Sequence, residues 1–254
     1  MNKFWAIVII LLGAEINSIY AESSEKDSEN MKMEVNLVSR YMWRGYKLGG
    51  SGFQASVVGE LFGNSSQALK LEAWGYTDFD VSTKEVDLSL SYFFLKKNAA
   101  VALYDYWYVP EITQDYLDYK NNSTSHTLEV QLSYIHNLTK NDDLIFMWAT
   151  IVYGNDKKRS SLGSFKQAYS SYFEIKYRGN FLFPNYGCEA SIGFSPWESP
   201  TNYMVEKFSW INAELKINRS FELNHNVELI PSVALTINPK HNDACISFGA
   251  AFLF

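Results

Sequence analysis

Apolar and polar residues alternate along most of this chain from Met33 onward, and no other feature restricts its fold as strongly. In residues 86–94 (VDLSLSYFF) the apolar positions share one parity, and the polar residues Asp87, Ser89 and Ser91 share the other. Residues 126–134 (HTLEVQLSY) and 211–217 (INAELKI) repeat the pattern. A period of two places successive side chains on opposite faces, so it predicts strands with one apolar and one polar face. No comparable stretch has helical periodicity.

The alternation divides the chain into about twelve strands, most of them about ten residues long, which is the length that a tilted strand needs to cross a bilayer. They begin near Met33, Phe53, Ala68, Glu85, Ala99, Ser125, Asp143, Ala168, Tyr186, Phe208, Asn226 and Ala244. Backbone groups in hydrocarbon must all be paired, so strands span a membrane only as a closed sheet. The predicted fold is therefore all-β: a transmembrane, antiparallel, up-and-down β-barrel of about twelve strands.

The connections between these strands support the count, because outer-membrane barrels have short periplasmic turns and longer external loops. Short polar connections occupy residues 63–67, 96–98 and 137–142, and they alternate with long ones at residues 110–124, 154–165 and 195–206. Two connections break the rule: residues 48–52 (LGGSG) give a short first loop, and residues 178–186 (RGNFLFPNY) give a long turn.

The N-terminus predicts export. Lys3 precedes an apolar run over residues 4–14, and Ala21 precedes a polar stretch, which is the pattern of a signal peptide cleaved after Ala21. A lone membrane anchor is the competing interpretation, but the run is about half of the roughly 20 residues that a spanning helix needs. The predicted organisation is a signal peptide (1–21), a flexible polar leader (22–32) and a barrel (33–254). Export and a barrel together predict the outer membrane of a Gram-negative bacterium.

The last strand suggests how such a barrel is assembled. Its apolar parity comprises Ile246, Phe248, Ala250, Phe252 and the terminal Phe254. This arrangement resembles the carboxy-terminal signal by which bacterial outer-membrane barrels are recognised for assembly. The resemblance implies the barrel assembly machinery as a partner through the strand ending at Phe254, beside outer-membrane lipid and lipopolysaccharide. A net charge of −6 without a basic block gives no reason to expect nucleic acid.

Residues 39–45 (SRYMWRG) combine two arginines with three large apolar side chains. An arginine at the lipid midplane of a barrel costs roughly 2–4 kcal/mol. Alternation is therefore expected to send Tyr41 and Trp43 to lipid and to leave Arg40 and Arg44 facing inward.

A simple turn near residues 49–51 fixes the expected register of the first strands. It sets Arg40 opposite Glu60 and Arg44 opposite Ser56 on the inward face. The next turn brings Lys70 across from Glu60. The sequence thus predicts a ladder of Arg40, Glu60 and Lys70 across three strands.

Parity places further charged residues inside the barrel. The candidate lumen or pore residues are Arg40, Arg44, Glu60, Lys70, Glu72, Glu85, Asp87, Glu129, Glu174 and Glu214. Acids outnumber bases, so an open lumen would favour cations or neutral polar solutes. We expect a porin-like channel or uptake pore for small polar solutes. The alternative is a structural or surface-binding barrel plugged by ion pairs, because a barrel of about twelve strands lies between filled small barrels and open porins.

A lipid-modifying enzyme is the third hypothesis. Such chemistry needs a nucleophile or a base oriented by a partner, or carboxylates around a metal. No string such as G-x-S-x-G or H-E-x-x-H occurs. His126 with Ser125 and Thr124 is the only constellation of note, and solvent-exposed polar residues explain it better. No catalytic residue, metal or cofactor is therefore predicted.

Residues 39–45 also match the pattern Ser-Arg-Tyr-x-Trp-Arg-Gly, with Met42 at the variable place. This resembles an early motif in a family of uncharacterised exported bacterial proteins of similar length. Residues 72–80 (EAWGYTDFD), with the pair Trp74-Gly75, are similar to the same family. Its members are predicted outer-membrane β-barrels, so the resemblance implies an architecture and no substrate.

Overall fold

The computed structural model describes residues 31–109, 115–121, 123–161, 163–180, 182–183 and 185–254. The predicted signal peptide lies outside the described residues, as does the predicted leader up to residue 30. Strand β1 begins at Met31, two residues before the predicted start of the barrel. Within the described ranges, no helix has the length and apolar character needed to cross a membrane.

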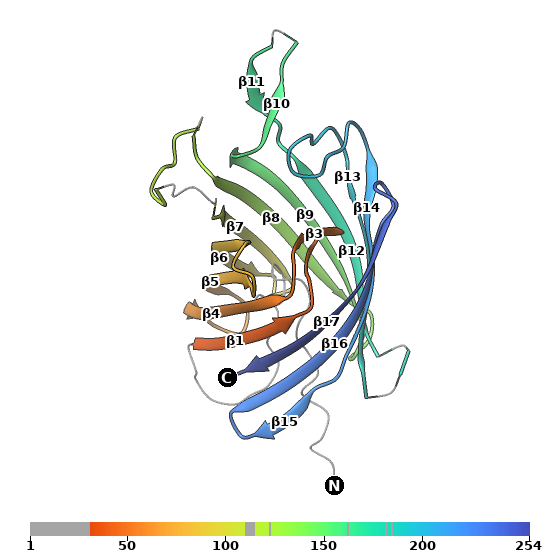
Figure 1. Cartoon of the computed structure of the whole chain (residues 1–254). Coiled ribbons are helices and arrows are strands. Elements are labelled where there is room, and N and C mark those ends of the chain that lie inside the picture. Colours follow the sequence, from red (N-terminus) through yellow and green to blue (C-terminus); the bar gives the residue numbers. More distant parts are fainter. Residues whose placement is uncertain (1–30, 110–114, 122, 162, 181, 184) are drawn as a thin grey trace.

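Twelve antiparallel strands form one closed barrel (Figure 1). They are β1 (Met31–Val38), β4 (Gly52–Gly63), β5 (Ala68–Asp78), β6 (Lys84–Phe94), β7 (Ala99–Tyr108), β8 (His126–Asn137), β9 (Asp143–Gly154), β12 (Ser171–Gly179), β13 (Gly187–Ser195), β14 (Ser209–Asn218), β16 (Val227–Asn238) and β17 (Asp243–Leu253). Pairing of β1 with β17 and of β14 with β16 closes the sheet. The predicted fold class is confirmed, and each predicted strand start lies within three residues of an observed one.

Five short strands lie apart from the twelve that close the wall. β2 (Tyr41–Trp43) and β3 (Tyr46–Gly49) form a hairpin inside the barrel, and β10 (Lys157–Arg159) and β11 (Phe165–Gln167) form a hairpin that projects beyond the rim (Figure 1). β15 (Phe221–Asn224) pairs only with β16. We call the end that carries β10 and β11 the loop end, and the end where β1 begins the turn end.

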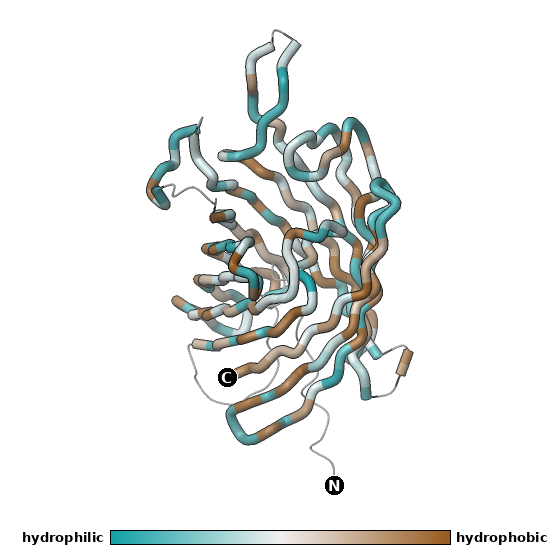
Figure 2. The backbone as a smooth tube through the Cα atoms, in the orientation of Figure 1, coloured by the Kyte–Doolittle hydropathy of each residue, from teal (hydrophilic) through white to brown (hydrophobic). Residues whose placement is uncertain are grey.

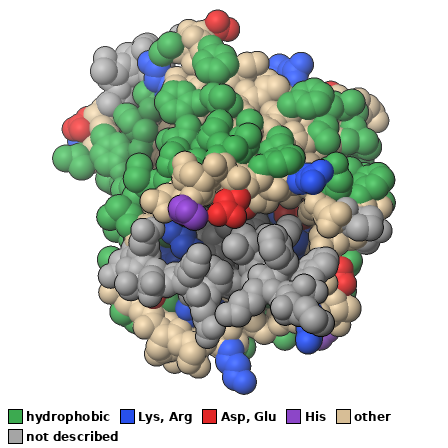
Figure 3. All heavy atoms as spheres, turned by 90° about the horizontal axis from the view of Figure 1, so that it is seen from below, with side chains coloured by type: hydrophobic (Ala, Val, Ile, Leu, Met, Phe, Trp, Pro, Cys, Tyr) green, Lys and Arg blue, Asp and Glu red, His purple; other side chains and the backbone are tan. Residues whose placement is uncertain are grey.

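The wall has an apolar outer face and a polar inner face. In β6 the side chain of Leu88 is 40% exposed, whereas Ser89 is 5% exposed, as the alternation predicts. Figure 2 shows the same alternation of hydrophobic and hydrophilic residues along the barrel strands. Figure 3, which views the molecule from the turn end, shows hydrophobic side chains gathered along the outside of the wall. Large apolar side chains exposed on the barrel strands include Leu37, Phe53, Leu71, Leu103, Leu132, Ile192, Leu215, Val233, Leu235, Ile246 and Phe248.

The register of β1 and β4 corrects the predicted first hairpin. Val38 pairs with Gly52, and Ser56 faces Glu34 rather than Arg44. Residues 39–51 do not continue this ladder, because they fold into the lumen and form β2 and β3. The predicted pairing of Arg44 with Ser56 is therefore wrong.

The predicted three-strand ladder is only half correct. Arg40 follows the loop end of β1, whereas Glu60 lies near the turn end of β4, so the predicted Arg40–Glu60 pair is wrong. The Glu60–Lys70 pair is confirmed: the two residues are neighbours across β4 and β5, and Lys70 Nζ lies 3.8 Å from Glu60 Oε2.

Candidate lumen site

A tight turn at Arg44 and Gly45 makes the inner hairpin. The φ angles are +46° and +86°, and Trp43 pairs with Tyr46 across the turn. Positive φ at both central residues is characteristic of the type I′ turn, whose twist suits a two-residue hairpin. Glycine adopts such a φ without steric cost. The Arg-Gly pair in residues 39–45 therefore marks the tip of a hairpin rather than the middle of a wall strand.

The tip of this hairpin docks on the barrel wall at β14 and β16. A Cβ at Gly45 would lie 2.0 Å from the carbonyl oxygen of Ile211 in β14, and Asn238 Nδ2 of β16 donates to the Gly45 carbonyl at 3.2 Å. Ile211 is fully buried, although the predicted parity placed it with the outward residues of β14. The register of β13 and β14 shifts at Ile211, and the extra residue of this β-bulge reverses the facing of its side chain.

Arg44 and Glu129 form a buried ion pair at the tip. Arg44 Nη1 lies 2.7 Å from Glu129 Oε2, and Nη2 lies 2.7 Å from Oε1. Two parallel bonds of this kind fix the guanidinium in one orientation. Its central carbon lies 4.8 Å from the ring centroids of both Trp43 and Tyr172. The hairpin from β1 is thus joined to β8 and β12 across the lumen.

Aromatic rings add further contacts between the hairpin and the rest of the barrel. Tyr203, in the connection between β13 and β14, is fully buried and stacks on Trp43 with centroids 5.4 Å apart. Its hydroxyl accepts a hydrogen bond from Arg44, and its carbonyl accepts one from Tyr46 Oη. Hairpin and connection together narrow the lumen at this level.

The aromatic residues of the hairpin face inward, not to lipid. Tyr41 is 3% exposed and packs against Trp74 and Tyr76 of β5, with centroids 5.6 and 4.6 Å apart. Trp43 contacts Tyr106 of β7 at 6.5 Å. The predicted lipid positions of Tyr41 and Trp43 are wrong because these residues do not belong to the wall, where parity would have decided their facing.

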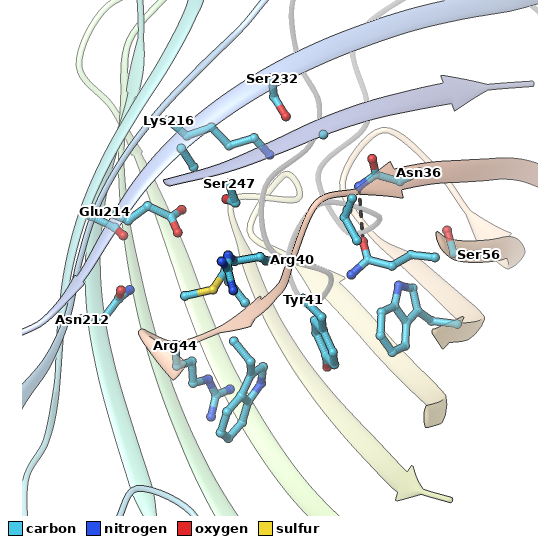
Figure 4. Close-up of a pocket in the computed structure, with 18 of the residues that line it drawn as sticks. Asn36, Arg40, Tyr41, Arg44, Ser56, Asn212, Glu214, Lys216, Ser232 and Ser247 are labelled. Carbon is cyan, nitrogen blue, oxygen red and sulfur yellow. Dashed lines mark hydrogen bonds between the residues drawn. The ribbon is translucent and has the colours of Figure 1, made fainter. Parts of the chain in front are cut away.

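A cavity of about 150 Å³ lies beside the hairpin within the barrel (Figure 4). This space is large enough for several water molecules. Hydroxyl groups of Ser56, Ser191, Ser232 and Ser247 form part of its wall. Its charged lining residues are Glu34, Arg40, Arg44, Glu72, Glu174, Lys176, Glu214 and Lys216.

The ten candidate lumen residues fall into three groups. Arg40, Arg44, Glu72, Glu174 and Glu214 line the cavity. Glu85, Asp87 and Glu129 are buried, with Glu129 beneath Arg44. Glu60 and Lys70 form their pair nearer the turn end.

Sequence reasoning missed two kinds of residue inside the barrel. Glu34 and Asn36 line the cavity from β1, and their alternation with Val35 and Leu37 was a sufficient signal. Tyr203 lies in a connection without periodicity, and no sequence signal marks it.

His126 lies under the connection between β7 and β8, away from the cavity lining. It is fully buried, with Nδ1 2.8 Å from Asp105 Oδ1 and Nε2 2.6 Å from the carbonyl oxygen of Tyr116. The Tyr119 ring stacks on it at 4.1 Å. The expectation of an exposed residue is therefore wrong, because this connection packs over the imidazole. Both ring nitrogens are engaged by protein atoms, so neither is available to a substrate.

The same connection carries an exposed acid that helps to order it. The hydroxyl of Ser123 donates to Asp118 Oδ2 at 2.6 Å, and this bond, with one from the Lys120 amide, holds the pKa of the Asp118 carboxyl below its usual value. Across the described part of the chain, no group of three or more His, Cys, Asp or Glu residues is arranged to hold a metal ion.

Similarity to known proteins is limited to the fold. No protein-family model matches the chain and no curated protein is similar to it, so the likeness of residues 39–45 to an exported family stands on the motif alone. Among solved structures, an outer-membrane channel from Pseudomonas putida F1 is 13% identical, with a TM-score of 0.48 over 90% of this chain and 99% of that one. The strand pairings of this chain itself show a closed antiparallel β-barrel.

Two porins are similar to the barrel in the same way. The NanC porin is 9% identical, with a TM-score of 0.48 over 88% of this chain and 98% of that one. The KdgM porin is 7% identical, with a TM-score of 0.47 over the same shares. Likeness at this level says nothing of a solute, so the function has to be inferred from the lumen of this barrel itself.

Proposed function

We propose that the protein is an outer-membrane channel for small polar solutes, with its lumen narrowed by the β2–β3 hairpin. One observation carries the proposal: the cavity inside the closed barrel is lined by charged and hydroxyl-bearing side chains. Small barrels without a pathway fill their interior with packed side chains. Pores replace part of a solute's hydration with polar groups on their walls, which is what this lining offers.

The hairpin determines the route that a solute must take. Its tip contacts β14 and β16, and its sides contact β5, β8 and β12. A solute entering from the loop end must therefore pass beside the hairpin to reach the cavity. We place the loop end outside the cell, because external loops are the longer connections of outer-membrane barrels.

A plugged structural barrel is the second candidate. The Arg44–Glu129 pair and the stacked ring of Tyr203 favour it, because together they bind the hairpin across the lumen. Removal of the hairpin distinguishes the two candidates. A channel conducts ions before and after removal, whereas a plugged barrel conducts only after it.

Planar-bilayer recording of the purified protein tests the proposal. The informative variant lacks residues 41–49 and joins Arg40 to Gly50, which leaves a four-residue connection between Val38 and Gly52. Ser51 Oγ already donates to the Ser39 carbonyl at 3.0 Å, so these ends are close enough to join. We expect discrete conductance steps from the wild-type protein and larger steps from the variant.

A matched control deletes residues 157–167, the β10–β11 hairpin that projects beyond the rim (Figure 1). We expect its step size to equal that of the wild-type protein. Steps seen only after deletion of residues 41–49 would establish the plugged barrel instead. Absence of steps from correctly folded wild-type and variant proteins would overturn any channel function.

A further inference from the structure

Arg40 differs from the other cations at the cavity. Arg44 pairs with Glu129, and Lys176 Nζ lies 3.3 Å from Glu174 Oε1. No hydrogen bond or ion pair joins Arg40 to any residue that the structure describes. Figure 4 shows its side chain reaching from the segment between β1 and β2 into the space into which Glu214 and Lys216 project from β14. A guanidinium in this position presents a fork of donors that suits a carboxylate.

Acceptors without donors lie on the wall facing the same cavity. Asn212 is 5% exposed, and its Nδ2 donates to Tyr172 Oη at 3.1 Å, while its Oδ1 has no hydrogen-bond partner. Asn36 uses its Nδ2 on Gln54 in the same way and leaves Oδ1 without a partner. A buried acceptor without a donor is unfavourable, so both oxygens favour a ligand that carries N–H groups.

Glu214 adds a charge to these neutral acceptors. Its Oε2 receives a hydrogen bond from Thr236 Oγ1, at 2.8 Å. Asn212 and Glu214 are two positions apart on β14, so their side chains leave the same face about 6–7 Å apart. Together they form an acceptor surface for a cationic group.

The overall charge of the cavity argues against a simple ion. Its lining carries four acids, Glu34, Glu72, Glu174 and Glu214, and four bases, Arg40, Arg44, Lys176 and Lys216. A simple cation would be attracted by the acids and repelled by the bases, and a simple anion would experience the reverse. A dipolar molecule is attracted at both ends when its two charges are spaced to reach Arg40 and the acceptor surface of Asn212 and Glu214.

We propose that the cavity selects small zwitterionic solutes of the amino-acid type, with the carboxylate on Arg40 and the ammonium group on Asn212 and Glu214. The cavity volume of about 150 Å³ restricts the ligand to a small molecule. This inference rests on the proposed channel function, and it replaces the sequence-based expectation of a general preference for cations or neutral solutes. Binding must remain weak enough for release, so selectivity is expected in rates of passage rather than in tight affinity.

Solute entry into proteoliposomes tests the inference with two isomers, glycine and glycolamide, which have the same atoms but differ in charge separation. We expect glycine to enter at least about threefold faster through the wild-type protein, since charge-assisted bonds are stronger than neutral ones. Arg40→Gln and Glu214→Gln should each reduce this ratio to about one. Arg159→Gln, at the β10–β11 hairpin beyond the rim, is the matched control and should keep the ratio.

The possible outcomes separate the two proposals. Equal entry of glycine and glycolamide through the wild-type protein would overturn the zwitterion site and leave the channel standing. An equal advantage for ethylammonium over glycolamide would also overturn it, because that result means simple cation selectivity. Entry of neither isomer, through the wild-type protein or the variant lacking residues 41–49, would overturn the channel and the site together.

Discussion

At the scale of single residues, Arg44 and Glu129 form an ion pair that is costly to bury. Their side chains are 4% and 0% exposed, so both charges have left water. Such a pair stabilises only when its remaining bonding capacity is satisfied. Here Gln131 Nε2 and Tyr106 Oη also donate to Glu129, at 2.9 and 3.2 Å, and Tyr203 accepts from Arg44. The Glu129 carboxylate is well supported by these donors, and losing either member would leave the other charge buried without its counter-charge.

Glu129→Gln tests this dependence. The amide keeps the size of the side chain but leaves the Arg44 charge buried without a counter-charge, a change that typically costs about 3–5 kcal/mol. We expect the free energy of unfolding, measured by urea titration in lipid vesicles, to fall by that amount. The control is Glu198→Gln, because Glu198 is 48% exposed beside Lys158 and exposed pairs contribute about 0–1 kcal/mol. Equal losses for the two variants would show that the buried pair contributes no more to the free energy of unfolding than an exposed pair does.

At the scale of elements, the inner hairpin depends on the backbone at Gly45. Its φ is +86°, and an added Cβ would lie 2.0 Å from the Ile211 carbonyl oxygen. Two costs therefore arise from one methyl group: a strained turn and a clash at the docking contact. The second cost acts only while the hairpin is docked.

Gly45→Ala should therefore undock the hairpin. We expect larger or noisier conductance steps and faster trypsin cleavage after Arg44, which the docked hairpin protects. Gly163→Ala is the matched control, because Gly163 has a φ of +83° but nothing within 4 Å of its added Cβ. If both variants behave like the wild-type protein, docking of Gly45 on β14 does not hold the hairpin in place.

The hairpin also shows how far sequence reasoning reaches. Parity in β6 and β8 predicts the wall correctly, because each residue there faces either the outside of the barrel or the lumen. The same parity misplaces Tyr41 and Trp43, since alternation does not distinguish a wall strand from a strand folded inside the barrel. The signal that was available is the Arg44-Gly45 pair, whose positive φ angles form the turn.

The side-chain contacts inside the lumen join residues that are far apart in the sequence, so no local sequence pattern predicts them. Tyr203 meets Arg44 across 159 residues of sequence, from a connection without periodicity. Ile211 faces inward only because a bulge interrupts the register of β13 and β14. Parity could predict which charges lie inside the barrel, but it could not predict which of them meet.

At the scale of the whole molecule, the barrel separates two environments across a single sheet. β16 illustrates this: Val233 is 37% exposed on the outer face, and the next residue toward the N-terminus, Ser232, lines the cavity. The same wall thus presents an apolar outer face on one side and a polar cavity lining on the other. A charged side chain should therefore destabilise the barrel at an outward-facing position and be tolerated at the neighbouring inward-facing position.

Val233→Arg and Ser232→Arg test that separation. An arginine on the lipid face near the midplane costs about 2–4 kcal/mol, whereas one facing the lumen reaches water and the acids of the cavity. We expect Val233→Arg to lower the free energy of unfolding in lipid vesicles by about that amount, and Ser232→Arg to lower it far less while reducing conductance. In a detergent micelle, where the guanidinium reaches water more easily, the difference should shrink. Similar losses for both variants in lipid would mean that the outer face of β16 does not contact the hydrocarbon core.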